Sequence, residues 1–243
     1  MEIKRFFAEK EDYDGNNIKI YGEEFAHMTK VLRHKVGYRI IVNLDDGKDY
    51  ECTLTEIKPD CAVAKVDSIK ENECKTKAEV TLFQALPKGD KFDFIVQKCV
   101  ELGVEKIVPF LSRYTNESKF NIVRSRKIAI EACKQCGRSR KAEVAELNNF
   151  DGILGQLDGY DLIVMPYENA TTGRVGDIKG LKDAKKIALI IGSEGGFCPE
   201  EVDKIRDLGG EILSLGKRIL RCETASIVAS SLIMYEIGEL QGN

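Results

Sequence analysis

Three glycines, a serine and a glutamate form a short stretch that could bring a ligand close to the backbone. Residues 192–196 read GSEGG; they follow the apolar run 187–191 and precede Pro199. Glycine has no Cβ, so a ligand can approach its amides, and proline at the first position of a helix loses no hydrogen bond. The spacing differs from the G-x-G-x-x-G of dinucleotide-binding loops. By itself, the stretch fits both a ligand-binding loop and a plain tight turn.

A second stretch of the same kind lies closer to the C-terminus. Residues 216–225 read GKRILRCETA and connect a predicted strand at 211–215 to a predicted helix at 224–237. When two strands of one sheet each end in a glycine loop before a helix, both loops lie at the same edge of the sheet. A third loop, 165–168, ends the preceding strand. We therefore expect a binding site where the three loops meet.

The elements that would position these loops alternate between strands and helices. Hydrophobic periodicity predicts strands at 80–86, 106–110, 162–165, 187–191 and 211–215, and helices at 90–102, 124–136, 199–208 and 224–237. This alternation is typical of an α/β domain with a mainly parallel sheet.

The N-terminal part has a different pattern. Residues 38–44, 50–57 and 62–66 alternate like antiparallel strands, and with a helix at 23–32 they predict a small antiparallel barrel. A polar, charged stretch at 67–79 separates the two patterns. We therefore expect two domains, 1–70 and 71–243.

Composition and charge exclude several classes of protein. The chain has 243 residues, of which 43% are apolar and 32% charged, unlike disordered, collagenous or low-complexity chains. The formal net charge is -3, yet residues 119–141 carry eight basic side chains and one acidic one. A local excess of this kind favours a surface that docks a polyanion, because a merely solvated face would mix the two signs.

The eight cysteines are spread along predicted strands and helices, which favours reduced thiols over a disulfide framework. Cys133 and Cys136 have CxxC spacing, but zinc would need two more ligands, and both histidines, His27 and His34, lie far away in the sequence. We therefore expect no metal. No apolar window is long enough to span a membrane, and the N-terminal residues are too charged for a signal peptide, so we expect a cytoplasmic protein without a membrane anchor.

The two glycine stretches together resemble a known class of enzymes. GSEGGF at 192–197 and LGKRILRCETA at 215–225 are similar to the SPOUT class of S-adenosylmethionine-dependent RNA methyltransferases. Within this class, the chain resembles the RsmE family, the 16S rRNA (uracil-N3)-methyltransferases. Blocks at 27–40, 86–110 and 129–140 resemble that family in the same order, so the resemblance covers nearly the whole chain.

The resemblance implies a fold, a cofactor and partners. The C-terminal α/β domain would be of the SPOUT type, with a deep trefoil knot that binds S-adenosylmethionine. The N-terminal domain would be a PUA-like, RNA-binding β-barrel. The family acts as a homodimer, and its substrate would be 16S rRNA of the small ribosomal subunit. The cofactor-binding residues would be Met165, Pro166, Ile191, Gly192, Ser193, Glu194, Gly195, Gly196, Leu215, Gly216, Ile219 and Leu220.

Methylation of uracil N3 requires that a proton leaves the nitrogen and that the resulting negative charge is stabilised. The candidates for the anion are Arg221 and Arg138, because guanidinium is permanently charged; Arg113 is a further candidate. Glu223 and Glu194 could accept the proton or orient an arginine, and Glu223 could instead cap the last helix. The target uridine must be unpaired or flipped, since N3 takes part in base pairing. The residues expected to contact RNA are Arg33, Arg39, Lys88, Lys91, Arg113, Arg124, Arg126 and Arg140.

Two other functions compete with this one. A SPOUT-class ribose 2′-O-methyltransferase of tRNA or rRNA shares the GSEG loop, although a Ser-Leu-Asn-type turn would then be expected at 219–224, where this chain reads ILRCET. A non-catalytic RNA-binding assembly factor could keep the same fold. Methyl transfer to rRNA would distinguish the enzyme from the assembly factor.

Overall fold

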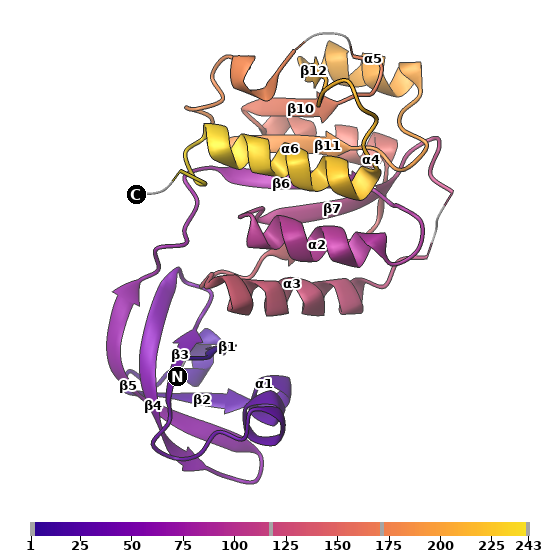
Figure 1. The fold of residues 1–243 in the computed structure, drawn as a ribbon. Coiled ribbons are helices and arrows are strands. Elements are labelled where there is room, and N and C mark those ends of the chain that lie inside the picture. Colours follow the sequence, from indigo (N-terminus) through magenta and orange to yellow (C-terminus); the bar gives the residue numbers. More distant parts are fainter. Residues whose placement is uncertain (1–2, 117–118, 171–172, 242–243) are drawn as a thin grey trace. The chain divides into compact units, whose positions relative to one another are not determined.

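The helices and strands in Figure 1 are those of a computed structural model, which describes residues 3–116, 119–170 and 173–241. The chain divides into two units. The first contains the residues up to Lys75 together with Cys133–Lys141, and the second contains Thr76–Ala132 and the residues from Ala142 onward. The split after Lys75 lies close to the expected boundary near residue 70, whereas the inclusion of Cys133–Lys141 in the first unit was not expected.

The first unit is built on a five-stranded sheet with the order β1-β3-β4-β5-β2. Its strands are β1 (Arg5–Phe7), β2 (Asn17–Tyr21), β3 (Arg39–Asn43), β4 (Lys48–Ile57) and β5 (Cys61–Glu71). All neighbouring pairs are antiparallel except β1 and β3, which run parallel. The strands expected at 38–44, 50–57 and 62–66 do pair antiparallel. The parallel strand β1 was not predicted, because three residues are too few for their alternation to be recognised.

The predicted helix at 23–32 is divided in the structure. Residues Gly22–Ala26 form α1, and His27–Val31 continue as a π-helix, labelled η2. Met28 of this π-helix is fully buried. Its side chain joins the core of the first unit, which also contains Phe6, Ile18, Ile20, Ile40, Val42, Leu54, Ala62 and Ala64.

The second unit is built on a parallel sheet with the order β12-β10-β11-β6-β7-β8, and β9 also pairs with β7. The strands are β6 (Glu79–Ala85), β7 (Lys106–Leu111), β8 (Glu143–Val144), β9 (Asn148–Asn149), β10 (Leu162–Pro166), β11 (Lys186–Ile191) and β12 (Glu211–Leu213). Every pair in it is parallel. The predicted α/β domain with a parallel sheet is thus confirmed. The two-residue strands β8 and β9 were missed because they carry no periodic pattern.

Helices cover both faces of this sheet. The helices are α2 (Lys91–Glu101), α3 (Ile122–Cys136), α4 (Phe150–Leu154), α5 (Pro199–Asp207) and α6 (Cys222–Glu236). On one face, α6 packs against α2 and β11, and the two helices lie side by side in Figure 1. On the other face, residues of α4 and α5 join a cluster with Phe83 and Ile190.

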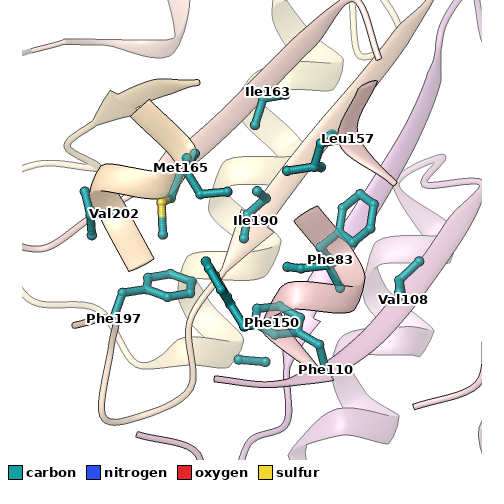
Figure 2. Packing of buried hydrophobic residues seen from close by; sticks show 14 residues of the cluster. Phe83, Val108, Phe110, Phe150, Leu157, Ile163, Met165, Ile190, Phe197 and Val202 are labelled. Atoms are coloured by element: carbon teal, nitrogen blue, oxygen red, sulfur yellow. The ribbon is translucent and has the colours of Figure 1, made fainter. Parts of the chain in front are cut away.

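Aromatic rings fix the loop that follows β11. Figure 2 shows Phe110, Phe150 and Phe197 packed together in the core of the second unit. The rings of Phe110 and Phe197 are stacked, with centroids 6.4 Å apart and an interplanar angle of 11°. Phe197 is 4% exposed and directly follows the glycine stretch at 192–196. Burial of its ring therefore anchors one end of this glycine-rich loop.

The path of the chain after β12 determines where the last loop lies. β12 is an edge strand beside β10, whereas α6 packs against α2 and β11. The connection at 214–221 therefore passes across the carboxyl ends of β10 and β11. This path agrees with a knotted C-terminal segment, and the knot itself stays a prediction.

Candidate functional site

A pocket of about 480 Å³ lies at the carboxyl ends of β10, β11 and β12. Three segments wall it, namely 166–168, 191–197 and 214–222, together with Ala225 of α6. Of the residues expected at the cofactor, the pocket is lined by Pro166, Ile191, Gly192, Ser193, Glu194, Gly195, Gly196, Leu215, Gly216, Ile219 and Leu220. Met165 is the exception, because it is fully buried in the core beneath and is not among the lining residues.

The glycines at 192–196 are required by close packing. A Cβ on Gly195 would lie 2.7 Å from Cβ of Tyr114 and 3.0 Å from its carbonyl oxygen. A Cβ on Gly192 would lie 3.2 Å from Cα of Gly196, and Gly196 itself has φ +65°. The amide of Gly196 donates to the carbonyl of Ser193 at 3.0 Å. The loop is therefore folded tightly on itself and on residue 114, so its backbone forms the wall of the pocket.

An ion-pair cluster stands at the rim of the pocket. Lys91 Nζ lies 2.6 Å from Glu194 Oε1 and 3.8 Å from Glu223 Oε2. The amide of Lys88 donates to both carboxylate oxygens of Glu194 at 3.2 Å. Burial alone would raise the pKa of Glu194, but the hydrogen bonds from Lys91 and from the Lys88 amide outweigh it and lower this pKa. Glu194 is therefore ionised at neutral pH.

The start of α6 brings Arg221 and Cys222 to the pocket. Arg221 is the residue before the first turn, is exposed, and lines the pocket. Cys222 Sγ lies 3.4 Å from Glu223 Oε2. Burial, with the neighbouring carboxylates of Glu194 and Glu223, raises the pKa of the Cys222 thiol to about 12. The thiol is thus neutral at physiological pH and is not a nucleophile there.

Some residues at the site were not among those expected at the cofactor. They are Phe197, Ser214, Cys222 and Ala225, which line the pocket within or directly beside the two glycine stretches. Gln84 is fully buried at the end of β6 and contacts the carbonyl of Gly192. A glutamine in the mostly apolar run at 80–86 is the signal that could have identified it.

The residues expected to contact RNA are distributed over several surfaces. Lys88 and Lys91 lie at the rim of the pocket, through their contacts to Glu194. Arg113 is exposed, and its amide donates to Glu201 Oε1 at 2.8 Å. On α3, Arg124 Nε lies 2.7 Å from Asp93 Oδ2.

The remaining expected RNA contacts lie on α3 and in the first unit. Arg126 Nε on α3 donates to the Val144 carbonyl at 3.0 Å. In the first unit, Arg33 is exposed and has a backbone φ of +55°. Arg39 Nη2 lies 3.9 Å from Glu51 Oε2.

Arg138 and Arg140 belong to the segment 133–141, which the structure groups with the first unit rather than with the pocket. This segment is held by ion pairs and hydrogen bonds within that unit. Lys134 Nζ lies 2.8 Å from Glu24 Oε1 and is 7% exposed, and Lys141 Nζ lies 3.0 Å from Glu9 Oε1. Part of the basic excess at 119–141 therefore neutralises carboxylates of this chain.

Within the three described ranges, no group of three or more His, Cys, Asp and Glu side chains could hold a metal ion. All eight cysteines are free thiols. Across the same ranges, no helix has both the length and the apolar character needed to cross a bilayer.

Comparison with known proteins agrees with this fold. An RNA methyltransferase domain matches residues 74–234, and an RNA methyltransferase PUA domain matches residues 20–67. Two similar proteins are both named ribosomal RNA small subunit methyltransferase E. The one from Bacillus subtilis is 29% identical over 99% of this chain and 100% of its own length. The one from Buchnera aphidicola (Acyrthosiphon pisum) is 31% identical over 99% of this chain and 96% of its own.

A solved structure is similar over nearly the same length. It is that of a ribosomal RNA small subunit methyltransferase E from Neisseria gonorrhoeae bound to S-adenosylmethionine. It superposes with a TM-score of 0.85 at 26% identity, covering 96% of this chain and 98% of that one. The sheet, the pocket and the preceding PUA domain define a SPOUT-class RNA methyltransferase fold. Within that class, the chain belongs to the ribosomal RNA small subunit methyltransferase E family.

Proposed function

We propose that this chain transfers a methyl group from S-adenosylmethionine to N3 of a uridine in 16S rRNA of the small ribosomal subunit. The observation that carries the proposal is the pocket at the ends of three adjacent parallel strands, in a chain of this family. The names of the similar proteins and the cofactor in the N. gonorrhoeae structure support it. We also propose that the protein acts in the cytoplasm as a homodimer.

The residues of the pocket fit the proposed cofactor chemically. Apolar side chains of Ile191, Leu215, Ile219 and Leu220 suit an adenine ring, and the glycine backbone leaves room for polar groups close to the chain. The carboxylates of Glu168 and Glu194 suit the positive charges of the sulfonium and the amino group. When bound, S-adenosylmethionine supplies an electrophilic methyl group on its sulfonium sulfur. The eleven expected residues that line the pocket remain proposed contacts, and Met165 supports the pocket from the core beneath it.

The proposed roles of the charged residues follow from their surroundings. Arg221 lines the pocket and holds the negative charge that spreads over the uracil carbonyls as the N3 proton leaves. Glu223 accepts that proton, because its contact to Lys91 is 3.8 Å, whereas Glu194 is held at 2.6 Å and has a lowered pKa. Glu194 instead orients Lys91. Alignment of the reactants supplies the larger part of the rate, about 7–11 kcal/mol for well-oriented groups.

The remaining charged residues are proposed to bind RNA. Lys88, Lys91, Arg113, Arg124 and Arg126 would contact phosphates from the second unit. Arg33, Arg39 and Arg140 would do so from the first unit, and Arg138, which also belongs to that unit, keeps its proposed role of stabilising the uracil anion. Phosphate contacts fix the position of an RNA without specifying its sequence, so the choice of uridine would depend on the shape of the rRNA around a flipped base.

Isotope transfer tests the proposal. Purified protein is incubated with methyl-labelled S-adenosylmethionine and small-subunit rRNA from cells that lack the gene, and the nucleosides are separated by mass spectrometry. We expect labelled N3-methyluridine at a single position. Label on a ribose 2′-oxygen would identify a 2′-O-methyltransferase instead. Absence of label despite RNA binding would identify a non-catalytic assembly factor.

A further inference from the structure

A buried amide lies directly beneath the pocket. Gln84 is 0% exposed and belongs to β6, which lies between β11 and β7 in the sheet. Its register partner is Ile191, the last residue of β11 and the first of the glycine-rich wall. An amide buried among apolar side chains is costly unless its hydrogen bonds are made. The partners of Gln84 therefore indicate why a polar side chain stands here.

These partners come from the two sides of the pocket. Gln84 Nε2 donates to the carbonyls of Ala85 at 2.9 Å and Gly192 at 3.4 Å. Gln84 Oε1 accepts from Ser226 Oγ at 2.5 Å. This orientation of the amide is required, because the two carbonyl oxygens can accept only from the NH₂ group. Ser226 is also fully buried, and its Oγ lies 2.8 Å from the carbonyl of Cys222.

The Gln84 amide itself joins the two sides of the pocket, because it donates to Gly192 and accepts from Ser226, one helical turn after Cys222. Ser226 has a single hydroxyl proton, so the Cys222 carbonyl competes with Gln84 for it. Gly192 begins the glycine loop, and Cys222 begins α6; both residues line the pocket. We infer that Gln84 and Ser226 are positioning residues that hold the glycine loop and the start of α6 at the separation required by the cofactor. The inference rests on the proposed function and assigns the pair to cofactor binding rather than to the chemical step.

Loss of the pair should affect affinity more than the rate at saturation. Without the Gln84 amide, the carbonyls of Ala85 and Gly192 and the hydroxyl of Ser226 each lose a hydrogen-bond partner. The glycine loop and the start of α6 can then move relative to each other. The cofactor must then order them when it binds, which weakens binding. The groups proposed to act on uracil, Arg221 and Glu223, are not contacted by Gln84. Once the cofactor is bound, they act as before.

The helix α6 provides a matched control. Ser226 and Ser230 are both 0% exposed and stand one turn apart. Ser230 Oγ contacts Cys99 Sγ of α2 at 3.7 Å, and Ser230 is not among the pocket residues. Ser226→Ala and Ser230→Ala therefore delete the same group from equally buried positions of one helix, and only Ser226→Ala removes a bond to Gln84. Gln84→Met removes the amide while keeping the length of the side chain.

The experiment measures the dissociation constant of S-adenosylmethionine by calorimetry, together with KM and kcat on rRNA, for the full chain and the three variants. Ser226→Ala and Gln84→Met should raise the dissociation constant and the cofactor KM about tenfold and change kcat less than about threefold. Ser230→Ala should leave the dissociation constant, the cofactor KM and kcat unchanged. Unchanged cofactor binding in Ser226→Ala, or an equal loss in Ser230→Ala, would overturn the inference. A wild-type protein that binds no S-adenosylmethionine would instead overturn the proposed function.

Discussion

Arg221 precedes the first turn of α6, at the wall of the pocket. Its proposed role is to stabilise charge that develops only as the N3 proton leaves. Arg221→Ala should therefore lower the single-turnover methylation rate at saturating RNA and cofactor by about 10²-fold. Rapid-quench measurement of this rate, with the RNA dissociation constant measured in parallel, checks the prediction.

Arg126 on α3 provides the comparison for Arg221. A phosphate contact acts equally in the ground state and the transition state, so Arg126→Ala should weaken RNA binding and leave the saturated rate unchanged. The slope of binding against salt concentration should fall by about one unit or less. A normal saturated rate in Arg221→Ala, or a purely kinetic defect in Arg126→Ala, would reverse the two assignments.

The thiols of Cys222 and Cys74 should differ in reactivity. Cys222 is buried, and burial with nearby carboxylates raises its pKa to about 12 from 9.0. Its protonated form stabilises the native state fully below about pH 9, and this contribution is lost as the pH rises toward 12.

Cys74 is exposed. Iodoacetamide at about pH 8 should modify Cys74 well before Cys222, as measured by peptide mass spectrometry. Equal labelling rates would contradict the assigned burial.

The glycine loop after β11 should tolerate no side chain at its closest contact. In Gly195→Ala, the new methyl group would lie 2.7 Å from Cβ of Tyr114, so the loop must move. We expect at least a tenfold loss of cofactor affinity, with a modest loss of stability. Gly159→Ala is the control, because its Cβ would meet nothing within 4 Å. Calorimetric titration of both variants decides the matter, and equal affinities would remove this loop from the site.

Long periodic elements could be predicted, and short or non-local ones could not. The apolar run at 187–191 and the one-sided helix at 90–102 agree with β11 and α2, because both bury a regular pattern. The two-residue strands β8 and β9 are defined by pairing with β7, a contact distant in sequence.

The candidate site shows the same limit. Its loops were predicted from glycine motifs. The hydrogen bond between Gln84 and Ser226 could not be predicted, because the two residues are 142 positions apart in the sequence. The ion pair between Lys134 and Glu24 likewise joins residues that no local pattern relates.

Cofactor binding should stabilise the two units differently. The whole pocket lies in the second unit. A ligand at one hundred times its dissociation constant adds about 2.7 kcal/mol to the free energy of unfolding of whatever binds it. For a unit of this size, that corresponds to a rise of roughly 5–10 °C in Tm. Differential scanning calorimetry should show that S-adenosylmethionine shifts the transition of the second unit more than that of the first. An equal shift of both would mean that they unfold together.

The segment 133–141 also determines when the first unit can be completed during synthesis. Its lysines and amides bind Glu24, Glu9 and Asp45, which leave the ribosome much earlier. At roughly 5–20 residues per second, the nascent chain waits several seconds between residue 75 and residue 141. In that interval, the N-terminal residues are exposed to chaperones and proteases without the lysines that pair with Glu24 and Glu9. A chain truncated after residue 75 would lack segment 133–141 permanently, so its first unit would stay incomplete.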